Sequence, residues 1–165
     1  EIPNGRIIGA GSNSSYDGCP KFEVHMGALE ETDQTSNGYS SFYCGKLYLH
    51  AYKRGNLRMG GSASYSNIWT NYIYIGCKGE PTDTIQIWHY YDNSSVTDIE
   101  IREGARQPII LGGRGAAENI ANHILNRLAD NNDGDPITIT LGSTNLAKLT
   151  DEEKHIAIDK NYILA

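Results

Sequence analysis

Short segments with apolar residues two positions apart recur along the chain. The clearest are residues 47–49, 73–75, 99–101, 137–139 and 163–165. Because side chains alternate between the two faces of a β-strand, this spacing is typical of strands that bury one face. The pattern therefore predicts a chain rich in strands.

The steps between these segments are regular. The step from Leu47 to Ile73 equals the step from Ile73 to Ile99, and the step from Ile137 to Ile163 is again the same. Only the step from Ile99 to Ile137 is longer, which we interpret as an insertion of about a dozen residues. Equal steps of about 26 residues indicate a repeat protein whose coils stack on one another. The segments are therefore predicted to lie in adjacent rungs.

A second series of apolar pairs lies between the segments of the first series. It comprises residues 57–59, 85–87 and 109–111, and each begins a short distance after a segment of the first series. Glycine, proline and aspartate separate the two series, and these residues favour reversals of the chain. A strand, a corner, a second strand and a return would make one coil of about 26 residues.

The last third of the chain changes character. Residues 115 to 130 place apolar side chains at the spacing of an amphipathic helix. Thr150 and Glu153 have the capping-box pattern, which predicts a short helix ending near Lys160. The final coils are therefore expected to run strand, loop, helix, strand, with the helix covering the open end of the stack.

These patterns predict a β-rich α/β fold forming one solenoid domain over residues 1–165. Residues 1–45 are expected to be an irregular N-terminal β region, with strands near 7–8 and 22–26 and a polar loop at 30–41. Residues 46–113 are expected to form two-strand coils. Residues 114–165 are expected to form helix-containing C-terminal coils and a cap.

Charge and composition argue against several partners. The net charge is −6 and no basic stripe is present, which disfavours nucleic acid and anionic membrane surfaces. No apolar run approaches the roughly 20 residues that a membrane-spanning helix needs, so membrane insertion is not expected. The chain has eighteen glycines, eleven tyrosines and two phenylalanines, which is typical of strands and turns with amphipathic aromatic side chains.

No cofactor, metal or catalytic residue is predicted. Cys19, Cys44 and Cys77 lack zinc-binding spacing, although one disulfide among them stays open. The glycine-rich stretch 111–117 matches neither common phosphate-binding motif and is interpreted as a turn. His25, His50, His123 and His155 have no metal-like companions at helical spacing.

Residues 137–165, together with the helix expected at 117–130, resemble the C-terminal end of leucine-rich-repeat-like proteins of gut bacteria and their phages. The resemblance covers roughly the last third of the chain. Members often have Gly-Trp where Asn161-Tyr162 stand here. The resemblance implies a curved, right-handed, leucine-rich-repeat-like solenoid and a setting on a virion tail or a bacterial cell surface. It implies no catalytic residues.

Strand alternation predicts a row of polar and aromatic side chains on the outward face. If Leu47, Ile73 and Ile99 point inward, their neighbours point outward in columns. Such a surface combines rigid contact area with hydrogen-bonding groups, as recognition surfaces do. The alternatives are a cross-strand aromatic ladder that only stabilises the sheet, and a subunit interface. The candidate ligand-binding residues are Tyr48, His50, Tyr72, Tyr74, Trp88, Tyr90, Glu100 and Arg102.

Two loops have the Tyr, Ser and Asn composition of adaptable binding loops, namely residues 64–71 and 90–95. Plain solvated turns would have the same composition. Three functions follow as hypotheses. The first is a non-enzymatic adhesion module that recognises a cell-surface glycan or protein. The second is a structural subunit that uses the same face to self-associate or to pack against other virion or surface subunits. The third is a polysaccharide-degrading enzyme that uses Glu100.

Overall fold

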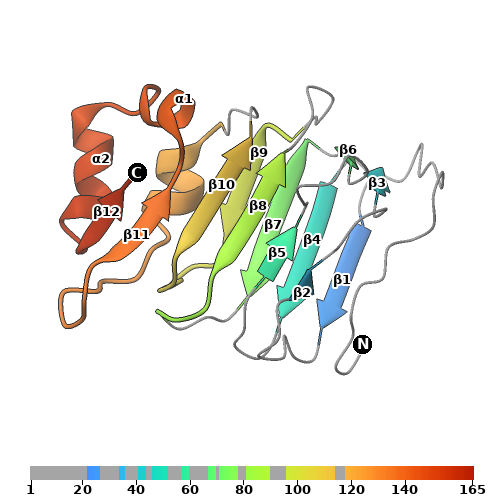
Figure 1. Cartoon of the computed structure of the whole chain (residues 1–165), viewed down its shortest axis with the longest axis horizontal. Coiled ribbons are helices and arrows are strands. Elements are labelled where there is room, and N and C mark those ends of the chain that lie inside the picture. The colour runs from blue at the N-terminus through green and yellow to red at the C-terminus, as the bar shows by residue number, and fades with distance from the viewer. Residues whose placement is uncertain are drawn as a thin grey trace.

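The fold is mixed α/β, with parallel sheets and short helices, in a computed structural model (Figure 1). The structure describes residues 22–26, 34–35, 41–43, 46–51, 57–59, 67–69, 71–77, 81–89, 96–113 and 118–165. Its elements are β1 (Phe22–Met26), β2 (Gln34–Thr35), β3 (Ser41–Tyr43), β4 (Lys46–Ala51), β5 (Leu57–Met59), β6 (Asn67–Trp69), β7 (Tyr72–Cys77), β8 (Ile85–His89), β9 (Asp98–Ile101), β10 (Ile109–Gly113), the π-helix η1 (Ala121–Leu125), β11 (Ile137–Thr140), α1 (Ser143–Leu146), α2 (Asp151–Ile158) and β12 (Tyr162–Leu164).

The strands form three parallel sheets that the chain visits in turn. The first sheet has the order β1-β4-β7-β9, the second β12-β11-β10-β8-β5-β2, and the third β3-β6. From β1 to β6 the chain passes through the first, second and third sheets twice in the same order. The strands follow one another along the longest axis of the molecule, and the helices gather at its C-terminal end (Figure 1).

The predicted registers of both series are confirmed where the structure describes them. Leu47 pairs with Ile73, which pairs with Ile99, so the equal sequence steps connect neighbouring strands of the first sheet. In the second sheet, the segments at 57, 85 and 109 also lie side by side. The strand at 22–26 joins the first sheet as well, with Phe22 opposite Leu47.

The third sheet was not predicted. Its strands β3 and β6 are separated by the same step as β4 and β7, with Ser41 opposite Asn67. Residues 64–71, interpreted above as a corner loop, therefore contain a strand, and the polar stretch 30–41 contains the short strand β2. Backbone pairing with a distant segment of the chain holds polar residues in strands when local composition favours a turn.

The assignment of residues 137–139 to the first series is wrong. Strand β11 pairs with β10 in the second sheet, with Ile109 opposite Ile139. Next to β9, helix η1 occupies the position that a further strand would take, linked by the bridges Asp98–Glu118 and Ala105–Leu128. The long step from Ile99 to Ile137 is therefore not an insertion. The segment that lies next to β9 is the helix η1, and the strand at 137–139 belongs to the second sheet.

The predicted register of the last strand is also wrong. Tyr162, not Ile163, lies opposite Ile137. Tyr162 is 3% exposed and Ile163 is 52% exposed. Because the side-chain period of a strand is two, a shift of one residue exchanges the buried and exposed faces. The tyrosine hydroxyl donates to the backbone oxygen of Ala129 over 3.0 Å, so its polar end is satisfied inside the fold.

The helix expected at 115–130 is much shorter than predicted. Residues 118–120 precede η1, and Asn119 has a φ of 54°, a left-handed conformation that interrupts a right-handed helix. The predicted apolar stripe is nevertheless buried at Ile120, Ala121, Ile124, Leu125 and Leu128. Residues 114–117 lie outside the described part of the chain.

The capping box at Thr150 is confirmed. The Thr150 hydroxyl accepts a hydrogen bond from the Glu153 backbone N–H, and the Glu153 carboxylate accepts one from the Thr150 N–H. Beyond the other end of α2, the Lys160 ammonium donates to the backbone oxygens of Leu125, Asn126 and Leu128 at 3.2, 3.0 and 2.8 Å. A cation at this point satisfies carbonyl groups that end a helix without partners. The segment that follows α2 is thereby fastened to η1.

The inner faces of the first and second sheets share one core. Leu47, Ile73 and Ile99 contribute from the first sheet, and Ile85 and Ile109 from the second. All five are at most 2% exposed. Burial of these isoleucine and leucine side chains stabilises the fold by roughly 1.5 to 3 kcal/mol each. The alternate residues of the same strands therefore face away from this core.

Gln107 is a fully buried polar residue. Its side chain is 0% exposed, and neither polar atom of its amide has a hydrogen-bond partner among the described residues. Replacing Gln107 with methionine, which has a similar shape, is expected to raise the free energy of unfolding by about 1 to 2 kcal/mol. Urea unfolding followed by circular dichroism measures this change. Gln86→Met, at a half-buried position of β8, is the matched control and should change little. A loss of stability in the Gln107 variant would mean that an ordered water satisfies the amide.

Candidate functional site

Six of the eight predicted site residues lie on the outward face of the first sheet. Tyr48 pairs with Tyr74, which pairs with Glu100, as predicted. The neighbouring columns are Lys46-Tyr72-Asp98 and His50-Gly76, and the Arg102 backbone N–H donates to the oxygen of Ile75 and places Arg102 beside Gly76. We call this surface the tyrosine face; it comprises Lys46, Tyr48, His50, Tyr72, Tyr74, Gly76, Asp98, Glu100 and Arg102.

The rings of the tyrosine face form one contiguous cluster. Tyr48 lies at its centre, with ring centroids 5.5 Å from Tyr72 and 5.8 Å from Tyr74. The His50 ring lies 5.6 Å from Tyr74. These separations are within the range of favourable aromatic pairs. All four side chains are half-buried, so the cluster is packed and still reaches the surface.

The Glu100 carboxylate is held on both of its oxygens. Tyr72 donates its hydroxyl to one oxygen, and the Arg127 guanidinium lies 2.5 Å from the other. Arg127 comes from the segment just after η1 and also reaches the backbone oxygen of Ile101 at 3.4 Å. Glu100 therefore joins the tyrosine face to the helix at its edge.

Asp98 makes the same kind of connection. His123 of η1 contacts one carboxylate oxygen through Nδ1 at 2.7 Å, and the Asn119 amide donates to the other at 3.4 Å. The His123 ring also meets the Tyr72 ring edge-on, with centroids 6.5 Å apart. Helix η1 and the segment just after it thus border the tyrosine face and supply partners for both of its carboxylates.

Sequence reasoning missed Lys46, Asp98, His123 and Arg127. The Lys46 ammonium lies 5.2 Å from the centroid of the Tyr72 ring, at the range of a cation–π contact. His123 follows Asp98, and Arg127 follows Glu100, at nearly the same step that separates the strands of the first sheet. Extending that step into the helical segment would have found both. Their residue types alone, on a helix surface, gave no such signal.

Of the other two predicted site residues, one lies in a different sheet and one lies outside the described residues. Trp88 belongs to β8 of the second sheet, opposite Gly112. Tyr90 lies outside the described residues, as does the rest of the candidate loop 90–95. The six predicted residues on the first sheet therefore form the described candidate site, and Trp88 lies apart from them on the second sheet.

Tyr72 is poorly suited to act as a nucleophile. Burial raises the pKa of its hydroxyl well above the ordinary value, and the hydrogen bond to Glu100 and the charge of that carboxylate raise it further. Activation would need a lowered pKa or a free base beside the hydroxyl. Tyr72 instead keeps its proton, offers a ring for stacking and donates to a carboxylate that Arg127 already neutralises.

Alkaline pH is expected to destabilise the fold. Burial raises the pKa of Tyr162 to about 12 from its ordinary 10.0, and the pKa of Tyr72 is raised as well. Both phenols bind their protons more tightly in the folded state. The resulting stabilisation is complete below pH 10 and is lost as the pH rises through 12, by about 2 to 3 kcal/mol for Tyr162. Urea unfolding midpoints measured across this range test the loss. In Tyr162→Phe the decline should be shallower; an equal decline would exclude Tyr162 as its cause.

The described residues hold one further surface feature. An apolar groove at the C-terminal end is lined by α1, α2 and β12, and includes Ile158 and Ile163, which are 50% and 52% exposed. No helix in the described part of the chain is long and apolar enough to cross a membrane. Nor do its histidines, cysteines and carboxylates gather anywhere into a group of three that could hold a metal ion.

Comparisons with known proteins found no relative from which a function could be proposed. No family model matches the chain, and neither a curated protein nor a solved structure matches it.

Proposed function

We propose that the chain is a single right-handed solenoid of the leucine-rich-repeat-like kind, built from coils of about 26 residues. The support is threefold. The strands are parallel and paired in register, the chain passes repeatedly through the sheets in one order, and helices replace the first-sheet strands toward the C-terminal end. A strand paired with a helix in each coil is typical of leucine-rich repeats.

We further propose that this solenoid is a non-enzymatic binding module of a phage tail or bacterial surface protein. It recognises a glycan or protein through the tyrosine face. The observation that carries the proposal is the contiguous cluster of four half-buried rings on one outward face. Rings of this kind bind through their apolar faces while their hydroxyl and imidazole groups form hydrogen bonds.

Binding is favoured over catalysis by the state of the carboxylates. A glycosidase needs one carboxyl group that donates a proton and another that attacks or activates water. On the tyrosine face, Glu100 is bonded to Arg127 and Tyr72, and Asp98 to His123 and Asn119. Groups so bonded hold the surface in shape, which is the role we assign to them.

Binding to an array of bacterial surface glycans tests the proposal. Tyr48→Ala and Tyr74→Ala are each expected to weaken binding at least tenfold, as for central interface residues. Thr138→Ala, at an exposed position of β11 in the second sheet, is the matched control and should bind normally. Circular dichroism checks that each variant is folded. Folded tyrosine variants with unchanged binding would refute a role for this face. Trp88→Ala reports separately on the second sheet.

The tyrosine-rich composition of this face is also typical of protein–protein interfaces. It favours a second function, in which the chain is a structural subunit that packs against its neighbours through the tyrosine face. Light scattering separates the two. A stable oligomer that dissociates in Tyr48→Ala and Tyr74→Ala would support the structural role, whereas a monomer that binds glycan supports the first function.

A further inference from the structure

On the tyrosine face, both carboxylates have charged or hydrogen-bonding partners, whereas the guanidinium of Arg102 has none in the described part of the chain. Both carboxylates have partners from η1 or the segment beside it, since Glu100 contacts Arg127 and Asp98 contacts His123. Arg102 is half-buried, and its guanidinium has no hydrogen-bond or ionic partner among the described residues. The face therefore carries an unmatched positive charge.

Arg102 stands at the end of the ring cluster. It lies beside Gly76 in the neighbouring strand, and His50 lies on the far side of Gly76. Because Gly76 has no side chain, the column between arginine and histidine is filled only by backbone. Tyr74 precedes Gly76 by two positions on the same face. With strands about 4.8 Å apart, the arginine and the rings are within reach of one small ligand.

The net charge of the whole chain does not decide what binds here. A net charge of −6 repels anions at long range, but salt screens such effects beyond about 8 Å under physiological conditions. At contact distance the unpaired guanidinium dominates. Arginine donates two parallel hydrogen bonds to a carboxylate, a geometry that lysine lacks.

We propose that the tyrosine face recognises a carboxylate-bearing sugar, such as a uronic or sialic acid unit of a surface polysaccharide. The Arg102 guanidinium binds the carboxylate, the ring of Tyr74 stacks on the apolar face of the sugar, and the tilted ring of Tyr48 borders it. This inference rests on the proposed binding function and adds the chemical class of its ligand.

The ring geometry favours a sugar over an acidic peptide. Tyr48, Tyr74 and His50 form a row of neighbouring rings along the sheet surface, with planes tilted by 42° between the two tyrosines and by 49° between His50 and Tyr74. A pyranose ring offers such a row a flat apolar face with hydroxyls at its edge. A peptide that adds to a sheet is held by backbone hydrogen bonds at an open strand edge, and β7, at the centre of this face, is paired on both sides and offers no such edge.

The test compares polygalacturonate and polysialic acid with their methyl esters, which keep the sugar ring and mask the carboxylate. We expect the full chain to bind at least one acid form, and its ester at least tenfold more weakly. Arg102→Gln should weaken binding to the acid form ten- to a hundredfold, the loss expected when a charged hydrogen bond is removed. Arg102→Lys should restore part of it. Lys148→Gln, the same charge change at an exposed position far along the chain, should have no effect.

The outcomes separate this inference from the function on which it rests. Equal binding to acid and ester forms, lost in Tyr74→Ala, would overturn the carboxylate assignment and leave a glycan-binding face. Binding of a poly-glutamate peptide but of no polysaccharide would overturn the sugar assignment. Failure to bind glycan or peptide in any form would overturn both the inference and the proposed function.

Discussion

Replacing Tyr162 with alanine is expected to lower the free energy of unfolding by about 3 to 5 kcal/mol, the usual cost of truncating a large buried ring. Tyr162 is 3% exposed, and its hydroxyl donates to the backbone oxygen of Ala129 over 3.0 Å. The substitution would leave a cavity between β12 and the loop after η1, and it would remove a hydrogen-bond donor from the part-buried Ala129 carbonyl. Urea unfolding followed by circular dichroism measures the loss.

The neighbouring residue provides the matched control. Ile163 is 52% exposed, so Ile163→Ala should cost less than about 1 kcal/mol. If the predicted register, with Ile163 opposite Ile137, were true, the two effects would be reversed. A larger loss in the Ile163 variant would therefore contradict the observed register of β12.

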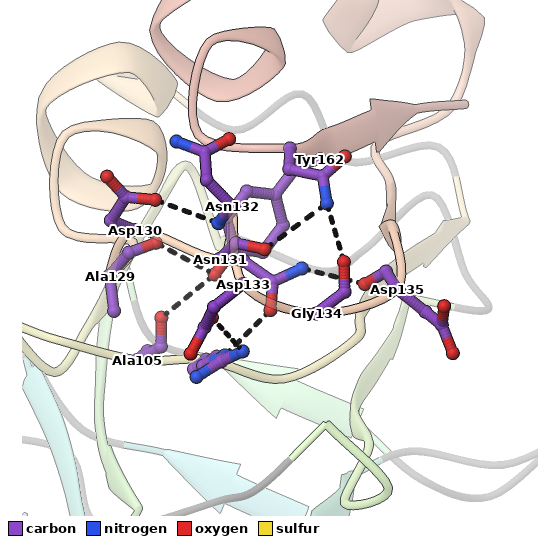
Figure 2. Close-up of polar contacts among 11 residues, drawn as sticks. Ala105, Ala129, Asp130, Asn131, Asn132, Asp133, Gly134, Asp135 and Tyr162 are labelled. Carbon is purple, nitrogen blue, oxygen red and sulfur yellow. Dashed lines mark hydrogen bonds and ion pairs between the residues drawn. The ribbon is translucent and has the colours of Figure 1, made fainter.

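Asn131→Ala is expected to lower the free energy of unfolding by about 2 to 4 kcal/mol, because it removes the acceptor of the Arg106 Nε–H and the donor to the Asp135 backbone oxygen. Figure 2 shows Asn131 at the centre of a network that spans three segments. Its side-chain oxygen accepts from Arg106 Nε at 2.7 Å, and its amide donates to the backbone oxygen of Asp135 at 2.7 Å. The Asn131 residue is 0% exposed, so the truncation also leaves a cavity inside the turn.

Asn132 is the control for this second prediction. It is exposed, and its side chain donates one bond, to the backbone oxygen of Asp159 at 3.2 Å. Asn132→Ala should cost less than about 1 kcal/mol. Equal losses in the two variants would mean that the turn conformation, rather than the Asn131 side chain, stabilises this corner. Thermal and urea unfolding of both variants decide between these possibilities.

The spacing of apolar residues predicted the first and second sheets because burial recurs at a fixed step along the chain. Leu47, Ile73 and Ile99 occupy equivalent core positions, so their separation reports the register directly. The prediction failed where strand residues are polar, because their spacing does not report burial. Ser41 and Asn67 are polar strand residues, held by pairing with a distant segment rather than by a local pattern.

The register of β12 failed for a different reason. Ile163 is apolar and stands at the repeat distance from Ile137, whereas the buried residue is the amphipathic Tyr162. A tyrosine can be buried when its hydroxyl finds an acceptor, and a single sequence does not reveal the Ala129 carbonyl that provides it.

The candidate site was predictable only in part. The columns of the tyrosine face followed from the equal sequence steps. The partners of Asp98 and Glu100 come from η1 and the segment after it, whose place beside β9 depends on tertiary packing. His123 and Arg127 therefore looked like ordinary helix-surface residues. Their roles appear only when the helix is placed against the sheet.

Because the steps between β4, β7 and β9 are equal, the tyrosine face could be lengthened along the first sheet by adding strands. Duplicating residues 46–71, which span one such step, would add one more row of rings without disturbing the neighbouring registers. On the opposite side, η1 ends the face at Asp98 and Glu100. For the polysaccharide ligand proposed above, duplication of this unit would be a simple evolutionary route to avidity, since each added row would supply another contact for the same chain of sugars.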